Sequence, residues 1–258
     1  MKKPGSRFSV RVGGRRPLTL LLLLPVLAVF QGCSLDENPT SVITPGNFYQ
    51  NEQEVMGGLA SVYAGLRNTL EFYLITSSVT TDEIVVPTRG SDWFDNGRWI
   101  ELHQQTWTAN SPSGLKDMCD AWNGFFAGVA DANVVMAGLE NVTVADQEIV
   151  TAEIRTLRAL YYFVLMDLFG GVPIVTDTEI LARPRPTRAE LFDFIEQELT
   201  QARNDLPTSW PSNMNGRLTQ GAADAILANM YLNAEVFTGT VSSGGLQQGQ
   251  ARWQDAID

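Results

Sequence analysis

The chain contains few of the side chains on which zinc sites and histidine-dependent enzymes rely. Its 258 residues include one histidine, His103, and two cysteines, Cys33 and Cys119. Zinc sites and catalytic triads built on histidine need several such groups close together, so we expect neither, and we predict no metal or other cofactor. A disulfide framework is also not expected, and Cys119, which lies in an apolar helical pattern, is predicted to be a small buried side chain.

Basic residues are scarce after position 17. Six of the 18 lysines and arginines precede Leu18, and no acidic residue does, so the rest of the chain has 12 basic residues against 29 acidic ones. Without that basic start the net charge is −17, compared with −11 for the whole sequence. So acidic a surface repels phosphate backbones, and nucleic acid is not an expected partner.

The basic start leads into an apolar run at residues 18–30, "LTLLLLLPVLAVF". The run is shorter than a membrane-spanning helix, which predicts a secretory signal peptide over residues 1–32. It ends in "FQGC", where Gly32 directly precedes Cys33, and this resembles the box of bacterial lipoproteins in which the cysteine is acylated after cleavage. An acylated Cys33 would anchor the mature chain to a membrane, with polar residues 33–47 as a tether. The alternative is an ordinary signal peptide that happens to carry a cysteine.

Helical periodicity begins after the tether. Apolar residues recur every three or four positions in five segments, at residues 51–70, 115–139, 147–169, 187–206 and 219–239. Thr187 and Glu190 have the spacing of a capping box, Pro207 ends that segment, and Gly170 with Gly171 ends the one before it. Small residues at Gly124 and Gly128 predict the close approach of a neighbouring helix.

This succession predicts a mainly α domain over residues 48–258. Antiparallel helix pairs would form a bundle or a helical-repeat solenoid, joined in part by long irregular loops. The short segment at residues 172–175 is expected to be an extended connector. The last residues, "ARWQDAID", look like the start of a further helix, so we expect the chain to be the N-terminal part of a longer protein.

Four segments together resemble one protein family. In chain order they are "GCSLDENP", "NFYQNEQEVMGGLASVYAGLR", "AEIRTLRALYYFVLMDLFGGVPIV" and "GRLTQGAADAILANMYL". They are similar to the N-terminal segments of the SusD/RagB-like nutrient-binding lipoproteins of the Bacteroidetes outer membrane. The resemblance implies a tetratricopeptide-like helical scaffold with an irregular remainder, lipid-anchored on the extracellular face. It also implies a SusC-like TonB-dependent transporter as partner, oligosaccharides or less often peptides as ligands, and no catalysis.

One loop contains the side chains that sugar binding requires. Residues 91–99, "SDWFDNGRW", combine flat aromatic rings, on which the C–H faces of a sugar can lie, with groups that bridge neighbouring hydroxyls. The candidate platforms are Trp93 and Trp99, and the candidate hydroxyl partners are Asp92, Asp95, Asn96 and Arg98. The preceding "TTDEIVVPTRG" resembles the family's stretch that leads to a loop touching glycan in some members. Alternatively, the tryptophans anchor the loop to the scaffold, which the apolar Ile100 and Leu102 favour for Trp99.

Two other functional classes remain open at this point. A two-carboxylate glycoside hydrolase would use Asp92 with Asp95, or Asp82 with Glu83, although adjacent acids are usually solvated. A helical-repeat adaptor would bind only protein. On the segment at residues 147–169, Glu153, Arg155 and Arg158 look functional, but charges at this spacing usually form structural pairs between helices.

Overall fold

The computed structural model describes residues 48–257. The predicted signal peptide, the predicted lipid site at Cys33 and the tether at residues 33–47 lie outside the described residues. Among the helices of the described part, none is both long and apolar enough to cross a membrane.

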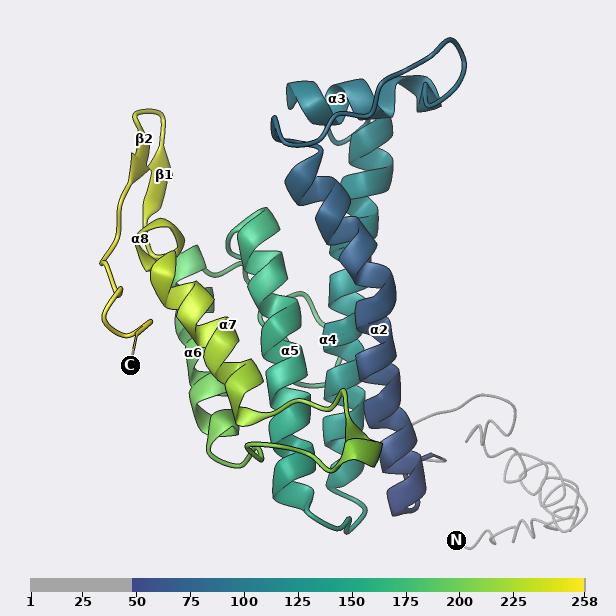
Figure 1. Ribbon diagram of the computed structural model, residues 1–258, viewed down its shortest axis with the longest axis vertical. Helices are drawn as coiled ribbons and strands as arrows, with labels where there is room; N and C mark the ends of the chain where they lie inside the picture. The colour runs from purple at the N-terminus through teal and green to yellow at the C-terminus, as the bar shows by residue number, and fades with distance from the viewer. Residues whose placement is uncertain (1–47, 258) are drawn as a thin grey trace, which may run out of the picture. The chain divides into compact units, whose positions relative to one another are not determined.

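The main helices follow one another in antiparallel order (Figure 1). They are α2 (Glu52–Ser78), α4 (Cys119–Leu139), α5 (Gln147–Phe169), α6 (Arg188–Arg203) and α7 (Gln220–Leu232). Each packs against the next, and α2 also contacts α5. The predicted succession of helices in antiparallel pairs is confirmed.

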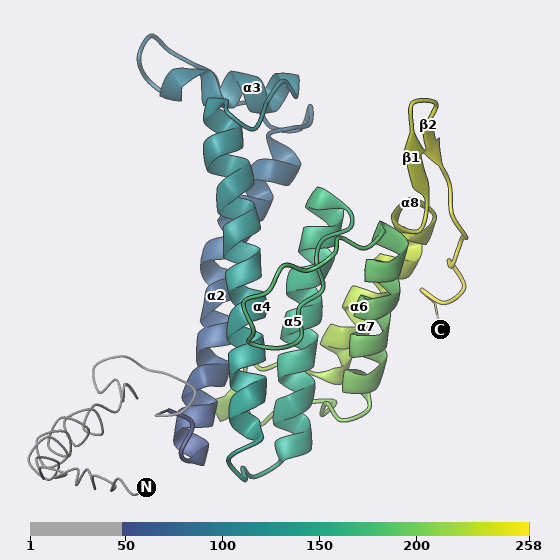
Figure 2. The same ribbon diagram turned by 180° about the vertical axis from the view of Figure 1, so that it is seen from behind.

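Shorter elements lie at the two ends of this array of helices (Figures 1 and 2). A 3-10 turn η1 (Asp95–Gly97), helix α3 (Arg98–Gln104) and a π-helical turn η2 (Gly114–Met118) lie where α2 ends and α4 begins. A second 3-10 turn, η3 (Ser212–Met214), precedes α7, and helix α8 (Ala234–Phe237) follows it. Strands β1 (Thr240–Ser242) and β2 (Gly245–Gln247) form an antiparallel hairpin, with Val241 opposite Leu246.

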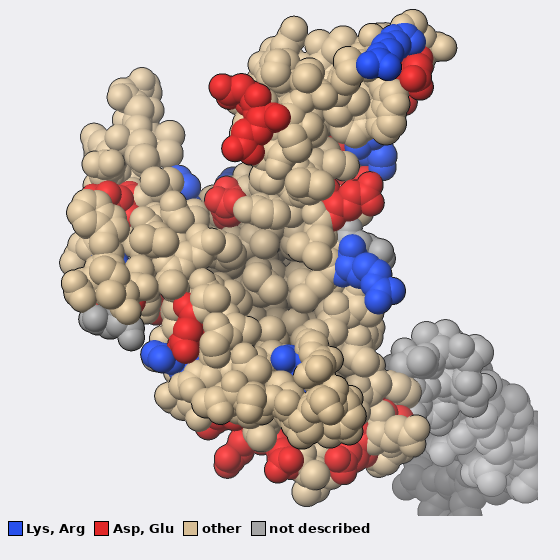
Figure 3. Space-filling view, viewed as in Figure 1, with Lys and Arg blue, Asp and Glu red and all other residues tan. Residues whose placement is uncertain are grey.

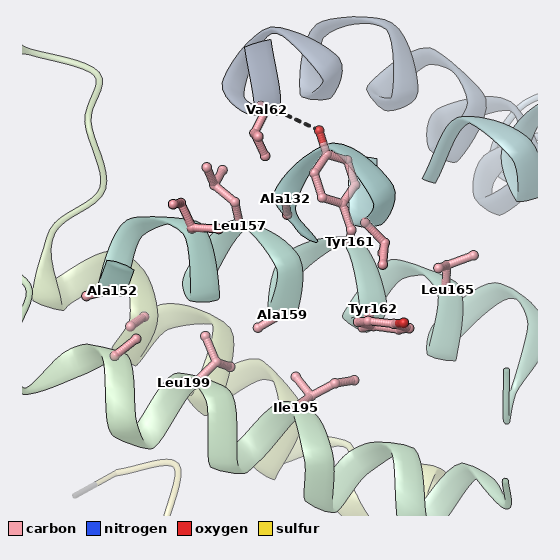
Figure 4. Close-up of a cluster of buried hydrophobic side chains, with 14 of the residues drawn as sticks. Val62, Ala132, Ala152, Leu157, Ala159, Tyr161, Tyr162, Leu165, Ile195 and Leu199 are labelled. Atoms are coloured by element: carbon pink, nitrogen blue, oxygen red, sulfur yellow. Dashed lines mark hydrogen bonds between the residues drawn. The ribbon is translucent and has the colours of Figure 1, made fainter. Parts of the chain in front are cut away.

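Helix α5 lies at the centre of the core (Figure 4). Tyr161, Tyr162, Leu157 and Leu165 are completely buried, and the Tyr161 hydroxyl donates a hydrogen bond to the Val62 carbonyl on α2 at 2.8 Å. Both faces of α5 are therefore covered, as the broad apolar stripe of its sequence indicates.

The close helix approach predicted from small residues occurs at Gly128. A Cβ added there would lie 2.2 Å from the Tyr161 ring, so only glycine fits between α4 and α5 at this point. Local signals at the helix ends also appear as predicted. The Thr187 hydroxyl accepts from the Glu190 N–H at 3.2 Å, which forms the capping box of α6, and α5 ends at Gly170, whose φ is +72°.

Buried charges on α5 pair with other elements, as predicted. Arg158 donates to Glu198 of α6 through Nε at 2.9 Å and to the Asn133 amide oxygen of α4 at 2.8 Å. The Asn133 amide in turn donates to the carbonyl of Val175 at 2.9 Å, which holds the extended connector against α4. These groups stabilise the scaffold.

Four expectations from the sequence are wrong in detail. Helix α2 runs to Ser78, two turns beyond the predicted end at residue 70, and residues 253–257 form turns rather than the start of a helix. Cys119 is exposed instead of buried, and Leu115, the first apolar residue of the periodic segment predicted at residues 115–139, is 60% exposed. The exposure of Leu115 and Cys119 is due to the π-helical turn Gly114–Met118. Its wider turn rotates the faces of the helix so that Asp117 points inward.

Candidate functional site

The loop that contains "SDWFDNGRW" has an unusual backbone. Trp93, Asp95 and Asn96 have φ values of +55°, +40° and +57°, in the left-handed region that side chains other than glycine rarely adopt. A residue in this region costs on the order of 1 kcal/mol or more, and it persists only where surrounding contacts fix it. Just before it, a tight turn is closed by two backbone hydrogen bonds between Arg89 and Asp92, at 3.0 and 3.1 Å.

The first contact that fixes the loop is the burial of Trp99. Its ring is 7% exposed and forms a small separate core with Val79 and Leu102, at the junction of α2 and α3. Its indole Nε1 donates to the Asp95 carboxylate at 2.7 Å. One of the left-handed residues is therefore tied directly to a buried ring.

The second contact is a buried ion pair. Arg98 donates to Asp117 through Nε at 2.7 Å, and a second guanidinium nitrogen contacts the other carboxylate oxygen at 2.5 Å. The side chains are 12% and 3% exposed, and the guanidinium carbon lies 4.2 Å from the centre of the Trp99 ring. The pair therefore joins the loop to the π-helical turn and covers the Trp99 ring.

A third contact fastens α3. The Glu101 carboxylate accepts hydrogen bonds from the Ser113 hydroxyl at 2.6 Å and from the Ser113 N–H at 3.1 Å. These two bonds hold the pKa of the Glu101 carboxyl below its usual value of 4.5, and the bond from the Ser113 hydroxyl has the larger effect. Exposed His103 lies on the same helix.

Trp93 is the tryptophan of this loop that faces solvent. It is 53% exposed, and its ring centre lies 5.7 Å from that of Trp99. It lines a surface pocket of about 350 Å³ together with Val85, Val86, Pro87, Arg89 and Asp92. On the face drawn in Figure 3, basic and acidic side chains lie side by side at the outer end of the region around α3.

The six predicted site residues therefore fall into two groups. Asp92, Trp93 and Asn96 are exposed, and the first two line the pocket. Arg98 and Trp99 face inward, while exposed Asp95 is bonded to the Trp99 indole. The anchoring interpretation describes Trp99, and the platform interpretation is open for Trp93.

Sequence reasoning did not single out Arg89, Phe94 or Asp117. Arg89 lies within the quoted "TTDEIVVPTRG", and Phe94, which is 47% exposed, within the loop itself. Asp117 is 19 positions from its partner Arg98. No spacing rule connects residues that far apart, so that contact had no signal in the sequence.

A family model of SusD-like proteins, described as "Starch-binding associating with outer membrane", matches residues 35–232. This chain belongs to the SusD-like family. The predicted family resemblance is thereby confirmed, and the loop at residues 80–99 lies inside the matched region.

Individual SusD-like relatives agree with this. The chain is 22% identical to SusD-like protein P25 of Formosa agariphila over 211 residues, 78% of this chain and 40% of that protein. It is 34% identical to the starch-binding protein SusD of Bacteroides thetaiotaomicron over 116 residues, 43% of this chain and 20% of that protein. The chain thus spans less than half the length of these relatives.

Solved SusD-like structures share the helical scaffold. A laminarin-binding SusD-like protein superposes with a TM-score of 0.61 at 25% identity, over 74% of this chain and 42% of that one. A SusD-like protein of Bacteroides fragilis superposes with a TM-score of 0.60 at 22% identity, over 78% and 39%. The mainly α, tetratricopeptide-like fold predicted for this chain is confirmed.

Proposed function

We propose that this SusD-like chain is part of a non-catalytic lipoprotein that binds oligosaccharides at the Trp93 loop. The observation that carries the proposal is the half-exposed Trp93 ring, which lines a pocket beside Asp92 and Arg89. An exposed aromatic ring offers a sugar a flat apolar face, while a carboxylate and a guanidinium at its edge accept and donate hydrogen bonds to hydroxyls.

The other four predicted site residues have two roles, contact with the ligand and support of the loop. Asn96, exposed at the turn beyond Trp93, supplies a further donor and acceptor to the ligand. Asp95, Arg98 and Trp99 keep the loop in its strained conformation through the contacts described above. A site fixed in advance loses less conformational entropy on binding, which favours affinity for flexible oligosaccharides.

The family and the N-terminal sequence support a proposal for the location and the partner. The family is described as associating with the outer membrane, and "FQGC" offers Cys33 for acylation. We infer that acylated Cys33 anchors the protein on the extracellular face, where it delivers its ligand to a SusC-like TonB-dependent transporter.

The carboxylates of the loop favour binding over hydrolysis. Asp92, Asp95, Asp82 and Glu83 are all exposed, and Asp95 accepts the Trp99 indole N–H at 2.7 Å. A glycosidase needs one carboxyl group kept protonated by a secluded environment and a second one that faces it across the sugar. None of these four exposed carboxylates has a secluded environment.

Isothermal titration of the chain against malto- and laminari-oligosaccharides tests the proposal, because relatives are named as starch-binding and laminarin-binding proteins. Binding without release of reducing ends supports it. Binding of peptides alone would favour the alternative of a peptide-binding uptake lipoprotein of the RagB type. Release of reducing ends would favour the two-carboxylate glycoside hydrolase. No binding to either class would contradict the proposal and favour the protein-only adaptor.

A further inference from the structure

A π-helical turn precedes the straight part of α4. The turn, Gly114–Met118, departs from α-helical geometry at a point where the chain passes very close to itself. A Cβ added to Gly114 would lie 1.8 Å from the Thr108 carbonyl oxygen, so this approach requires glycine. Turns of this kind inside helices often occur where a side chain must be directed to a functional site.

The side chain that this turn directs inward is Asp117. It is 4% exposed, and its two carboxylate oxygens receive the two N–H groups of Arg98 described above. Its neighbours in the same turn, Lys116 and Leu115, point to solvent. The π-helical turn thus places one carboxylate beneath the loop.

The contact continues from Arg98 to the aromatic pair. The guanidinium covers Trp99, whose indole is held by Asp95, and the Trp99 ring lies 5.7 Å from the Trp93 ring at an angle of 59°. Trp93 itself is 53% exposed, and the direction of its ring depends on its own left-handed backbone, on that of Asp95 and Asn96, and on the Trp99 ring beside it.

We propose that Asp117 is a positioning residue for Trp93. It does not touch the ligand, and it acts through Arg98 and Trp99 to keep the Trp93 ring presented to solvent in one orientation. The effect on ligand affinity rests on the proposed function, whereas the orientation of the two rings is a property of the free protein.

The experiment compares Asp117→Asn with Asp120→Asn in the whole chain. Asparagine preserves the size of the side chain but replaces one carboxylate oxygen by an NH2 group and removes the negative charge, so the two parallel N–H···O bonds from Arg98, one to each oxygen, cannot both form. Asp120 is the matched control, because it lies two residues beyond the same turn and pairs with exposed Lys116 at 2.7 Å. Both variants are measured by NMR of the tryptophan indole N–H groups, with Trp93→Phe and Trp99→Phe assigning two of the signals.

In Asp117→Asn we expect the signals of Trp93 and Trp99 to shift and those of Trp122 and Trp210 to stay in place. Oligosaccharide affinity should fall about tenfold, because two aromatic side chains must be ordered anew on binding. Asp120→Asn should change neither. Unchanged Trp93 and Trp99 signals in Asp117→Asn would overturn the proposal.

Arg98→Lys decides the matter if Asp117→Asn does not fold. Lysine keeps the charge but lacks the two-pronged guanidinium, so the same local shift is expected with the rest of the spectrum intact, and its absence would overturn the proposal. If the wild-type chain binds no oligosaccharide, the proposed function fails, while the indole signals still report on the positioning role of Asp117.

Discussion

The Glu153 carboxylate on α5 is completely buried and is neutralised by Arg217, which lies 64 positions further along the chain. The Arg217 Nε lies 3.1 Å from both carboxylate oxygens, and the Tyr63 hydroxyl of α2 donates to the same carboxylate at 2.5 Å. The Tyr63 hydroxyl also accepts the Leu218 N–H at 2.8 Å. One buried carboxylate thus joins α2, α5 and the segment that leads into α7.

Removing the positive partner should be costly. Arg217→Met leaves Glu153 buried without its counter-charge, and we expect the free energy of unfolding to fall by about 3–5 kcal/mol. Urea unfolding measures this change. Arg203→Met is the control, because its pair with Asp224 is 39% exposed on both sides and should contribute about 1 kcal/mol at most. Equal losses in the two variants would show that burial of the pair is not what matters.

A glycine pair tests the contact between α4 and α5. Gly128→Ala forces a methyl group against the Tyr161 ring and should lower the free energy of unfolding by about 1–3 kcal/mol. Gly57→Ala, on exposed α2 surface with nothing within 4 Å of the added Cβ, should instead raise it by about 0.5–1 kcal/mol. In thermal unfolding, we expect the melting temperature to fall in Gly128→Ala and to rise in Gly57→Ala. A neutral Gly128→Ala would mean that the helices can separate at no cost.

The capping box of α6 predicts a pH dependence. The Thr187 N–H and hydroxyl donate to Glu190 at 2.7 and 2.8 Å and lower the pKa of its carboxyl below the usual 4.5. Because the folded pKa lies below the unfolded one, this contribution is fully present above about pH 4.5 and is lost as the pH falls through the folded pKa.

Glu190→Gln should therefore flatten part of the loss of thermal stability in acid. The melting temperature of the wild type and the variant, followed from neutral to acid pH, measures this effect. Asp193→Asn, which removes an exposed carboxylate from the same helix, should keep the wild-type slope. Identical slopes for Glu190→Gln and the wild type would contradict the prediction.

The sequence predicted the helices well because their signals are local. The apolar stripe of α5, the capping box of Thr187 and Glu190, and the stop at Gly170 each depend on residues a few positions apart. The errors arose where tertiary contacts override local pattern. Asp117 is buried because Arg98 is there to receive it, and the π-helical turn that directs it inward exposes Leu115 and Cys119.

The candidate loop was found from composition, and the apolar residues that follow Trp99 favoured an anchoring role for it. The sequence did not decide between the two roles for Trp93, and only the fold shows that Trp93 faces solvent while Trp99 packs on Leu102. The left-handed backbone of Trp93 had no sequence signal either, because a tryptophan rarely adopts this conformation. The pocket residues Val85 and Arg89 were not assigned to the site, because only the fold places them beside Trp93.

The central claim is that the exposed Trp93 ring binds sugar. Calorimetric titration of Trp93→Ala against the oligosaccharide that the wild type binds most tightly tests it most directly. The control is Trp253→Ala, because Trp253 is similarly exposed, at 56%, but lies near the C-terminal end of the described residues, outside the Trp93 loop. We expect the affinity to fall about tenfold in Trp93→Ala, since a well-placed aromatic platform contributes on the order of 1–2 kcal/mol, and to be unchanged in Trp253→Ala. Wild-type affinity in a folded Trp93→Ala protein would contradict the account.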